Sequence, residues 1–134
     1  MSHSIVYVDT SALGALLVDQ PESASVLEWL DEAAASLVSS DLLETELRRL
    51  AVRVGADQRD VTQLLAGVSI AGLDRAVYRS AGLLPMPYLR SLDALHLEAA
   101  LRLNATAILT YDARLIEAAL AVGLSPISPG AEAV

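Results

Sequence analysis

The 134-residue chain has seventeen acidic and nine basic residues, a formal charge of −8, and 54% hydrophobic residues. This acidic balance argues against broad, non-specific nucleic-acid binding, which depends on many phosphate contacts. No apolar run reaches the ~20 residues that a membrane span requires, and the absence of cysteine excludes disulfides and thiolate chemistry. We expect one domain over residues 1–134, without a signal peptide or membrane segment, located in the cytoplasm.

Short apolar runs alternate along the chain with segments of helical periodicity. The predicted strands are 5–8, 36–39, 106–109 and 124–127, with a weaker one at 68–71. The predicted helices are 11–18, 22–35, 41–54, 57–66, 74–83, 91–103 and 112–122. Strands that alternate with helices indicate a parallel sheet. We therefore predict a three-layer α/β fold, with a short parallel sheet of four to five strands flanked by helices on both faces.

The first predicted strand ends on a carboxylate and two hydroxyls: Asp9, Thr10 and Ser11 directly follow the apolar run IVYV. These side chains can cap the next helix by accepting its free backbone N–H groups. Ligands of open parallel sheets also bind beyond the carboxyl ends of the strands, so Asp9 can equally belong to a binding site. This stretch alone leaves both interpretations open.

Two glutamates of the helix predicted at 41–54 differ in their positions. Glu44 lies opposite the apolar leucine stripe, with Arg48 four residues later as a surface partner. Glu46 is flanked by leucines four residues away on either side, so it lies at the edge of the buried stripe. Its carboxylate either faces a site or bends toward solvent or a neighbouring arginine.

Two aspartates later in the chain also occupy unexpected places. On the helix predicted at 91–103, Asp93 falls near the middle of the apolar face, although a first-turn acid can instead serve the helix dipole, with Ser91 as the cap. His96, one turn later, is most simply a packed core histidine. Asp112 follows an apolar strand and is also a good N-cap for the next helix.

These acids all lie at carboxyl ends of predicted strands or on helices beside them, and such places converge on one edge of a parallel sheet. Two unit charges ~4 Å apart repel by about 4 kcal/mol at an effective dielectric constant near 20, so such a cluster persists where protons or cations neutralise it. Carboxylate ligands without histidine or cysteine favour Mg²⁺, with Mn²⁺ able to substitute, over zinc. The sequence thus predicts a metal site formed by Asp9, Glu46, Asp93 and Asp112.

Several other chemistries fit the sequence poorly. A Ser–His–Asp hydrolase is disfavoured because the chain has no G-x-S-x-G turn, and a glycine-rich phosphate loop is absent. Receiver domains and aspartate-nucleophile phosphatases accept a phosphoryl group on a strand-end aspartate and rely on a lysine, whereas all nine basic residues here are arginine. Divalent ions held by carboxylates can activate water for phosphodiester hydrolysis without a protein nucleophile, and this chemistry remains.

Four stretches of the chain resemble the signature stretches of PIN domains, and most of all those of VapC toxins. They are YVDTSAL, VSSDLLETELRR, RSLDALHLEAAL and ILTYDARLIEAALAVGLSPISPG. The resemblance covers residues 5–53 and 90–130 and is weak through 57–88. It implies a PIN-like fold, Mg²⁺-dependent endoribonuclease activity on structured RNA, a homodimer and inhibition by a cognate VapB-like antitoxin.

The resemblance also implies roles for individual residues. Asp9, Glu46, Asp93 and Asp112 fall on the acidic quartet of the family, with Glu44 as the competing assignment for Glu46. Asp9 and Asp93 would bind the metal directly, whereas Glu46 and Asp112 would bind it directly or through water. The supporting hydroxyls would be those of Thr10, Ser11 and Thr110. The candidate RNA-contacting residues are Arg48, Arg49, Arg53 and Arg90.

A non-catalytic PIN-fold module that docks on a protein or RNA partner is the alternative to a nuclease. Mg²⁺-stimulated RNA cleavage that EDTA abolishes would distinguish the two. The high apolar fraction of so small a chain independently favours a two-fold homodimer, because its helices offer more apolar surface than one core needs.

Overall fold

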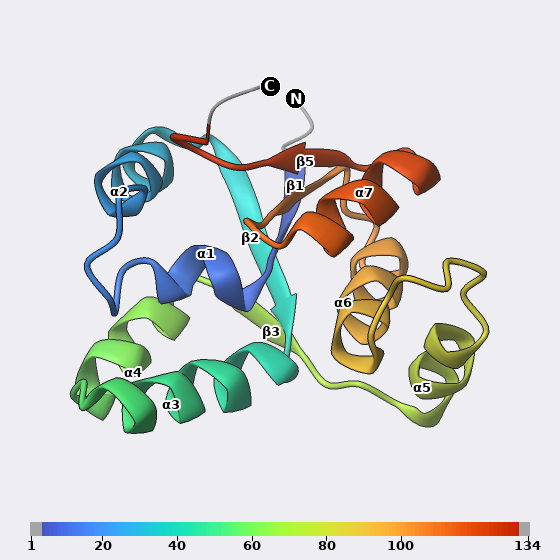
Figure 1. The fold of residues 1–134 in the computed structure, drawn as a ribbon, viewed down its shortest axis with the longest axis horizontal. Coiled ribbons are helices and arrows are strands. Elements are labelled where there is room, and N and C mark those ends of the chain that lie inside the picture. Colours follow the sequence, from blue (N-terminus) through green and yellow to red (C-terminus); the bar gives the residue numbers. More distant parts are fainter. Residues whose placement is uncertain (1–3, 132–134) are drawn as a thin grey trace.

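The computed structural model describes residues 4–131, which fold around a five-stranded parallel sheet (Figure 1). The strands are β1 (Ser4–Val8), β2 (Ala35–Ser40), β3 (Ser69–Ala71), β4 (Ala107–Leu109) and β5 (Ser125–Ile127), in the order β3-β2-β1-β4-β5. The helices are α1 (Thr10–Gly14), α2 (Ser23–Glu32), α3 (Leu42–Val54), α4 (Gln58–Ala66), α5 (Arg75–Gly82), α6 (Ser91–Arg102) and α7 (Ala113–Val122). The predicted three-layer α/β fold is therefore confirmed.

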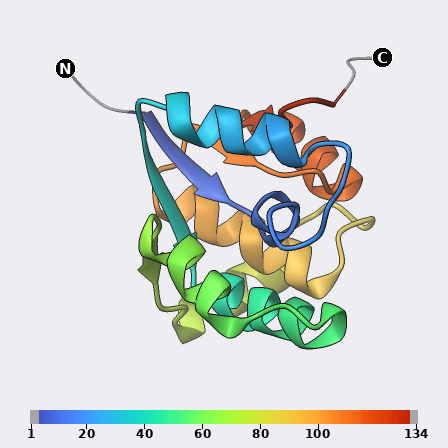
Figure 2. The ribbon, with the colours of Figure 1, turned by 90° about the vertical axis from the view of Figure 1, so that its left-hand side faces the viewer.

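Helices cover both faces of the sheet, as Figures 1 and 2 show from two directions. On one face α1, α3 and α4 enclose a core with Val6 and Val8 of β1, and Trp29 of α2 packs at its margin. On the other face α6 and α7 enclose a second core around Tyr7 and Ile108. Each fully buried aliphatic or aromatic side chain contributes about 1.5–3 kcal/mol, so the two cores supply the stabilisation that holds the sheet edge in place.

The central strand β1 explains how the chain delivers a carboxylate to the sheet edge. Successive side chains of a strand point to opposite faces, so Val6 and Val8 enter one core and Tyr7 the other. Asp9 directly follows β1, two residues after Tyr7, and its backbone N–H still donates to the carbonyl of Leu109 at 3.0 Å. The edge at which β1 and β4 end is therefore the place where the polar residues gather.

The predicted elements agree with the observed ones except at two helix ends. The helix predicted at 11–18 is shorter, because α1 ends at Gly14 and Leu16 and Leu17 donate to carbonyls only three residues earlier, as in tight turns. The helix predicted at 22–35 ends at Glu32, because Ala33 is extended and leads into β2. Among residues 4–131, no helix has the length and apolar character to cross a membrane.

Candidate functional site at the carboxyl edge of the sheet

Asp9 is held at the end of β1 by donors from two segments of the chain. Its Oδ2 atom accepts hydrogen bonds from Ser11 Oγ at 2.7 Å and Thr110 Oγ1 at 2.8 Å, and more weakly from the backbone N–H of Ser11 at 3.4 Å. Asp9 is therefore also the N-cap residue of α1, and it is only 6% exposed. The capping interpretation of Asp9 is therefore confirmed, and its role in a binding site stays a prediction, for which the Oδ1 atom is left without a protein donor among residues 4–131.

Glu46 reaches the same edge from α3. Its Oε1 atom accepts hydrogen bonds from Thr10 Oγ1 at 2.9 Å and from His96 Nε2 at 2.6 Å. Burial acts to raise the pKa of Glu46, but the hydrogen bond and charge of His96 and the Thr10 hydroxyl outweigh it and lower the pKa below its ordinary value. The alternative in which Glu46 bends toward solvent or a neighbouring arginine is therefore wrong. Glu44 instead pairs with Arg48 at 2.8 Å, as predicted.

Asp93 lies in the first turn of α6, where its Oδ2 atom accepts the backbone N–H of Arg90 at 3.2 Å. Arg90, not Ser91, is the N-cap residue, so the expected cap is one residue out. Burial raises the pKa of Asp93, the Arg90 N–H opposes this, and the charges of Asp112 and Asp9 raise it further. Asp93 is thus a helix-start acid and also a member of a repelling carboxylate cluster.

Asp112 is the N-cap residue of α7. Its Oδ1 atom accepts the backbone N–H groups of Arg114 at 2.9 Å and Leu115 at 3.1 Å, so the capping role open in the sequence is confirmed. The backbone N–H of Asp112 donates in turn to Thr110 Oγ1 at 3.0 Å. The Thr110 hydroxyl therefore links the backbone of Asp112 to the carboxylate of Asp9.

The four carboxylates share one pattern: a single oxygen of each takes the hydrogen bonds from protein donors. Those oxygens are Oδ2 of Asp9, Oε1 of Glu46, Oδ2 of Asp93 and Oδ1 of Asp112. The second oxygen of each group accepts no hydrogen bond from residues 4–131 that meets normal geometry, and Asp9 Oδ1 lies 3.6 Å from His96 Nε2. The fold thus fixes the orientation of each carboxylate while leaving an oxygen for water or a cation.

This donor set fits a hard divalent cation. Within residues 4–131, no group of three or more acidic, histidine or cysteine side chains is already arranged to hold a metal ion. Mg²⁺ does not require one, because it keeps several waters and binds through one or two protein carboxylates. A bound cation would neutralise the negative charges whose repulsion contributes to the raised pKa of Asp93.

The structure adds three residues that sequence reasoning did not place in the site: His96, Tyr7 and Ser40. His96 is 2% exposed, as expected of a core histidine, yet its Nε2 atom bonds Glu46 and its Nδ1 atom lies 2.7 Å from Tyr7 Oη. Tyr7 Oη also lies 2.9 Å from Ser40 Oγ. The available signals were the positions of His96 one helical turn after Asp93 and of Tyr7 two residues before Asp9 on the same strand.

Comparisons with known proteins establish the family of this chain. The model of the PIN domain family matches residues 6–120. The chain belongs to the PIN-domain family. Over 132 residues it is 36% identical to Ribonuclease VapC35 of Mycobacterium tuberculosis, which covers 94% of this chain and 98% of that protein.

Two solved structures share the fold of this PIN domain. The crystal structure of VapC20 of Mycobacterium tuberculosis, described as a toxin that cleaves the sarcin–ricin loop, has a TM-score of 0.76 at 15% identity. It covers 92% of this chain and 99% of that one. A toxin–antitoxin complex from Klebsiella pneumoniae has a TM-score of 0.73 at 16% identity, with 96% and 99% covered. At these identities the likeness establishes the fold alone.

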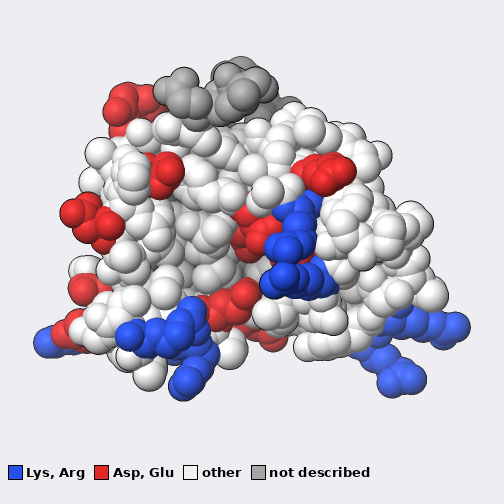
Figure 3. Space-filling model, viewed as in Figure 1, with Lys and Arg blue, Asp and Glu red and all other residues white. Residues whose placement is uncertain are grey.

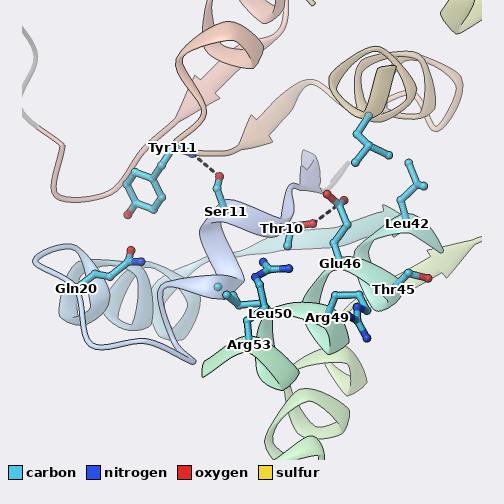
Figure 4. A pocket seen from close by; sticks show the side chains of 12 residues that line it. Thr10, Ser11, Gln20, Leu42, Thr45, Glu46, Arg49, Leu50, Arg53 and Tyr111 are labelled. Atoms are coloured by element: carbon cyan, nitrogen blue, oxygen red, sulfur yellow. Dashed lines mark hydrogen bonds between the residues drawn. The ribbon is translucent and has the colours of Figure 1, made fainter. Parts of the chain in front are cut away.

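A pocket of 640 Å³ adjoins the carboxylates of the PIN domain on the side of α1 and α3 (Figure 4). Glu46 forms part of its wall and turns its carboxylate toward Thr10, while Leu50 and Tyr111 supply apolar surface. Gly14 also lines it, and a Cβ atom there would lie 3.0 Å from the Leu50 side chain, which accounts for glycine at this close approach of α1 to α3. Of the four carboxylates, that of Glu46 lines the pocket, beside Thr10 and Ser11.

The candidate arginines separate into distinct groups. Arg49 and Arg53 line the pocket (Figure 4), whereas Arg48 bonds Glu44, Gln58 and Thr62 on the outer side of α3 and does not line it. Arg90 occupies the N-cap position of α6, where its backbone N–H donates to Asp93. Arg114, which the sequence prediction left out, acts against the raised pKa of Asp93 through its charge, so it lies near the cluster.

The distribution of charge on this side of the molecule follows the same arrangement. Figure 3 shows acidic side chains gathered toward the hollow at the centre of the face, with arginines on either side of them. A substrate that carries phosphates can therefore meet cationic side chains at the rim while the acids lie between them.

Proposed function

We propose that this PIN domain is a Mg²⁺-dependent endoribonuclease that acts as the toxin of a VapBC-type toxin–antitoxin pair, with Mn²⁺ able to replace Mg²⁺. The observation that supports the proposal is the proximity of the carboxylates: Asp112 and Asp9 act on Asp93 through their charges, and Asp9 and Glu46 both lie against His96. One oxygen of each carboxylate is left unbonded by the described residues. The relatives named ribonucleases support the reaction class.

Each residue of the cluster has a defined task in this proposal. Asp9 and Asp93 hold the cation, and Glu46 and Asp112 hold it directly or through water. Thr110 and Ser11 orient Asp9, and Thr10 orients Glu46. A bound divalent ion supplies activated water and stabilises charge on the leaving oxygen of the phosphodiester. Arg49 and Arg53 bind RNA phosphates along the adjoining pocket.

We also propose a cognate VapB-like antitoxin, a homodimer and a cytoplasmic location. The fold shared with a protein of a toxin–antitoxin complex supports the first partner. Exposed apolar side chains support self-association, because Tyr78 of α5 is 52% exposed and Leu83 immediately after α5 is 75% exposed. Light scattering at tens of micromolar should give the dimer mass, and a monomer there would refute this part.

The decisive experiment incubates the purified chain with structured RNA in millimolar Mg²⁺. We expect internal cleavage that EDTA abolishes, that fresh Mg²⁺ or Mn²⁺ restores, and that Asp9→Asn abolishes without loss of the folded state. Binding of RNA with no cleavage by the parent under any of these conditions would instead favour the non-catalytic module.

A further inference from the structure

His96 joins the deepest part of the second core to the carboxylates at the sheet edge. Both of its ring nitrogens are engaged: Nδ1 lies 2.7 Å from Tyr7 Oη and Nε2 lies 2.6 Å from Glu46 Oε1. The ring also meets that of Tyr7 edge to face, with centroids 5.6 Å apart. At 2% exposure the imidazole has no freedom to turn without breaking both bonds.

The partners of His96 settle which nitrogen donates. An ionised carboxylate only accepts hydrogen bonds, so the Nε2 atom, 2.6 Å from Glu46 Oε1, carries the proton that lies between them. The phenolic hydroxyl of Tyr7 can both donate and accept a hydrogen bond. Tyr7 can donate to Nδ1 while Ser40 donates to Tyr7, or accept from Nδ1 while donating to Ser40. In either arrangement Nε2 remains the donor to Glu46.

The anchor of this chain of hydrogen bonds is rigid. Tyr7 lies on the central strand and is 0% exposed, and Ser40 ends the neighbouring strand β2 and is also 0% exposed. Glu46, by contrast, comes from α3 at the pocket wall, where 27% of its side chain is exposed. Among the described residues, the Thr10 hydroxyl is the other donor to Glu46, and it bonds the same Oε1 atom. His96 is therefore the contact that ties the Glu46 carboxylate to the sheet.

We propose that His96 is a positioning residue: held by Tyr7, it fixes Oε1 of Glu46 and so directs the free Oε2 toward the other carboxylates. This inference rests on the proposed RNA cleavage at that edge. Partners that orient metal-site ligands typically affect activity by about 10- to 100-fold when removed. Loss of the His96 bond should therefore lower kcat within that range while leaving KM within about twofold, because the RNA-binding groups of the proposed function are Arg49 and Arg53, which this change does not touch.

The test compares His96→Gln with His96→Leu. The Gln side chain can place a donating amide near the position of Nε2, whereas Leu keeps much of the volume and donates nothing. We expect kcat to fall strongly in His96→Leu and to recover in large part in His96→Gln. Tyr7→Phe, which frees only the far side of the ring, should give a smaller loss. Val26→Ala in α2 is the control for lost stability, because Val26 is 0% exposed in the apolar core and should leave kcat unchanged below its melting temperature.

A second readout needs no activity and no metal. In the metal-free parent, the short bond to Glu46 should give a protected, downfield imidazole N–H proton resonance that disappears in His96→Gln and shifts in Glu46→Gln. Parent-like kcat in His96→Leu, equal kcat in the Gln and Leu variants, or a resonance indifferent to Glu46→Gln would each overturn the positioning role. A parent that binds but never cuts RNA would refute the proposed function instead, and the resonance would still decide whether His96 holds Glu46.

Discussion

Replacing Asp93 by asparagine separates a metal-binding carboxylate from an ordinary helix-start acid. Asparagine keeps the shape and can still accept the Arg90 N–H through its carbonyl oxygen. It removes one charge from a cluster in which Asp112 and Asp9 already raise the pKa of Asp93. If the site is as proposed, the variant should lose RNA cleavage and gain or keep stability in EDTA.

The magnitude follows from two opposing effects. A negative charge in the first turn of a helix contributes typically 0.3–1 kcal/mol, which asparagine forfeits. Burial and repulsion by the other carboxylates destabilise the ionised Asp93. Because this group is partly exposed, solvent screening limits that destabilisation to about 1 kcal/mol or somewhat more. The pKa of Asp93 is raised even with the Arg90 hydrogen bond counted, so repulsion and burial win. We expect a change between zero and about +1 kcal/mol, equivalent to at most about 3–5 °C in melting temperature.

The sign of the pH dependence gives an internal check. Because the pKa of Asp93 is raised on folding, its ionised form weakens the fold, and this penalty is relieved as pH falls through the folded pKa. Asp93→Asn should therefore differ most from the parent at neutral pH and converge with it in acid. In Mg²⁺ the difference in unfolding free energy between variant and parent should shrink or change sign. A Mg²⁺ concentration tenfold above Kd adds about 1.4 kcal/mol to the stability of a protein that still binds the ion.

The assay is thermal and urea unfolding of parent and variant, each with EDTA and with millimolar Mg²⁺, beside a cleavage assay. Asp60→Asn is the matched control, because Asp60 is an exposed first-turn acid of α4 and lies outside the cluster. It should lose a few tenths of a kcal/mol with or without metal. The reasoning would be refuted if Asp93→Asn behaved like this control and still cleaved RNA.

Three further predictions concern other parts of the site. Asp112→Asn keeps an α7 cap and should unfold within a few tenths of a kcal/mol of the parent, whereas Asp112→Ala should lose about 1 kcal/mol in urea melts, and both should lose cleavage. In EDTA, stability should be greatest between the lowered pKa of Glu46 and the raised pKa of His96, because the first contribution disappears as pH falls and the second as pH rises. His96→Leu should remove the alkaline decline in an unfolding series across pH. Arg49→Ala should raise KM for RNA about three- to tenfold with little change in melting temperature, while Arg48→Ala, outside the pocket, should leave KM near the parent value.

The order of the elements could be predicted because each depends on local pattern. The runs that became β1 and β4 are continuous apolar stretches bounded by polar residues, as buried parallel strands are. The capping roles of Asp9 and Asp112 were also open to prediction, since carboxylates directly after strands commonly cap the next helix. The end of α1 could not be predicted from the local pattern, because the leucines continue beyond Gly14 through residues that form turns.

The interactions of the site were harder to predict than its members, because they cross the fold. The helical periodicity of α6 places His96 on its inward face, but which residue bonds His96 depends on how α3 is placed relative to α6. The contact from His96 to Glu46 spans fifty positions in the sequence and the one to Tyr7 spans eighty-nine. Arg48 and Arg49 differ by one position and about 100° of helix rotation, and that rotation alone separates the surface pair from the pocket wall.

Stability and proposed chemistry occupy different parts of this molecule. The two apolar cores lie against the faces of the sheet, whereas the carboxylates lie at its edge, where burial and the charges of Asp112 and Asp9 raise the pKa of Asp93. The edge tolerates this because each carboxylate has one oxygen held by hydroxyl, imidazole or backbone donors. Those donors compensate part of the cost of burying the charges. Because all donors to a given carboxylate bond one of its two oxygens, the second oxygen of each group is left to bind a cation or water. A charge-removing substitution at Asp93 should therefore cost activity without costing the fold, while loss of a donor such as Thr110 should cost both, because Asp9 would then be buried with one partner fewer.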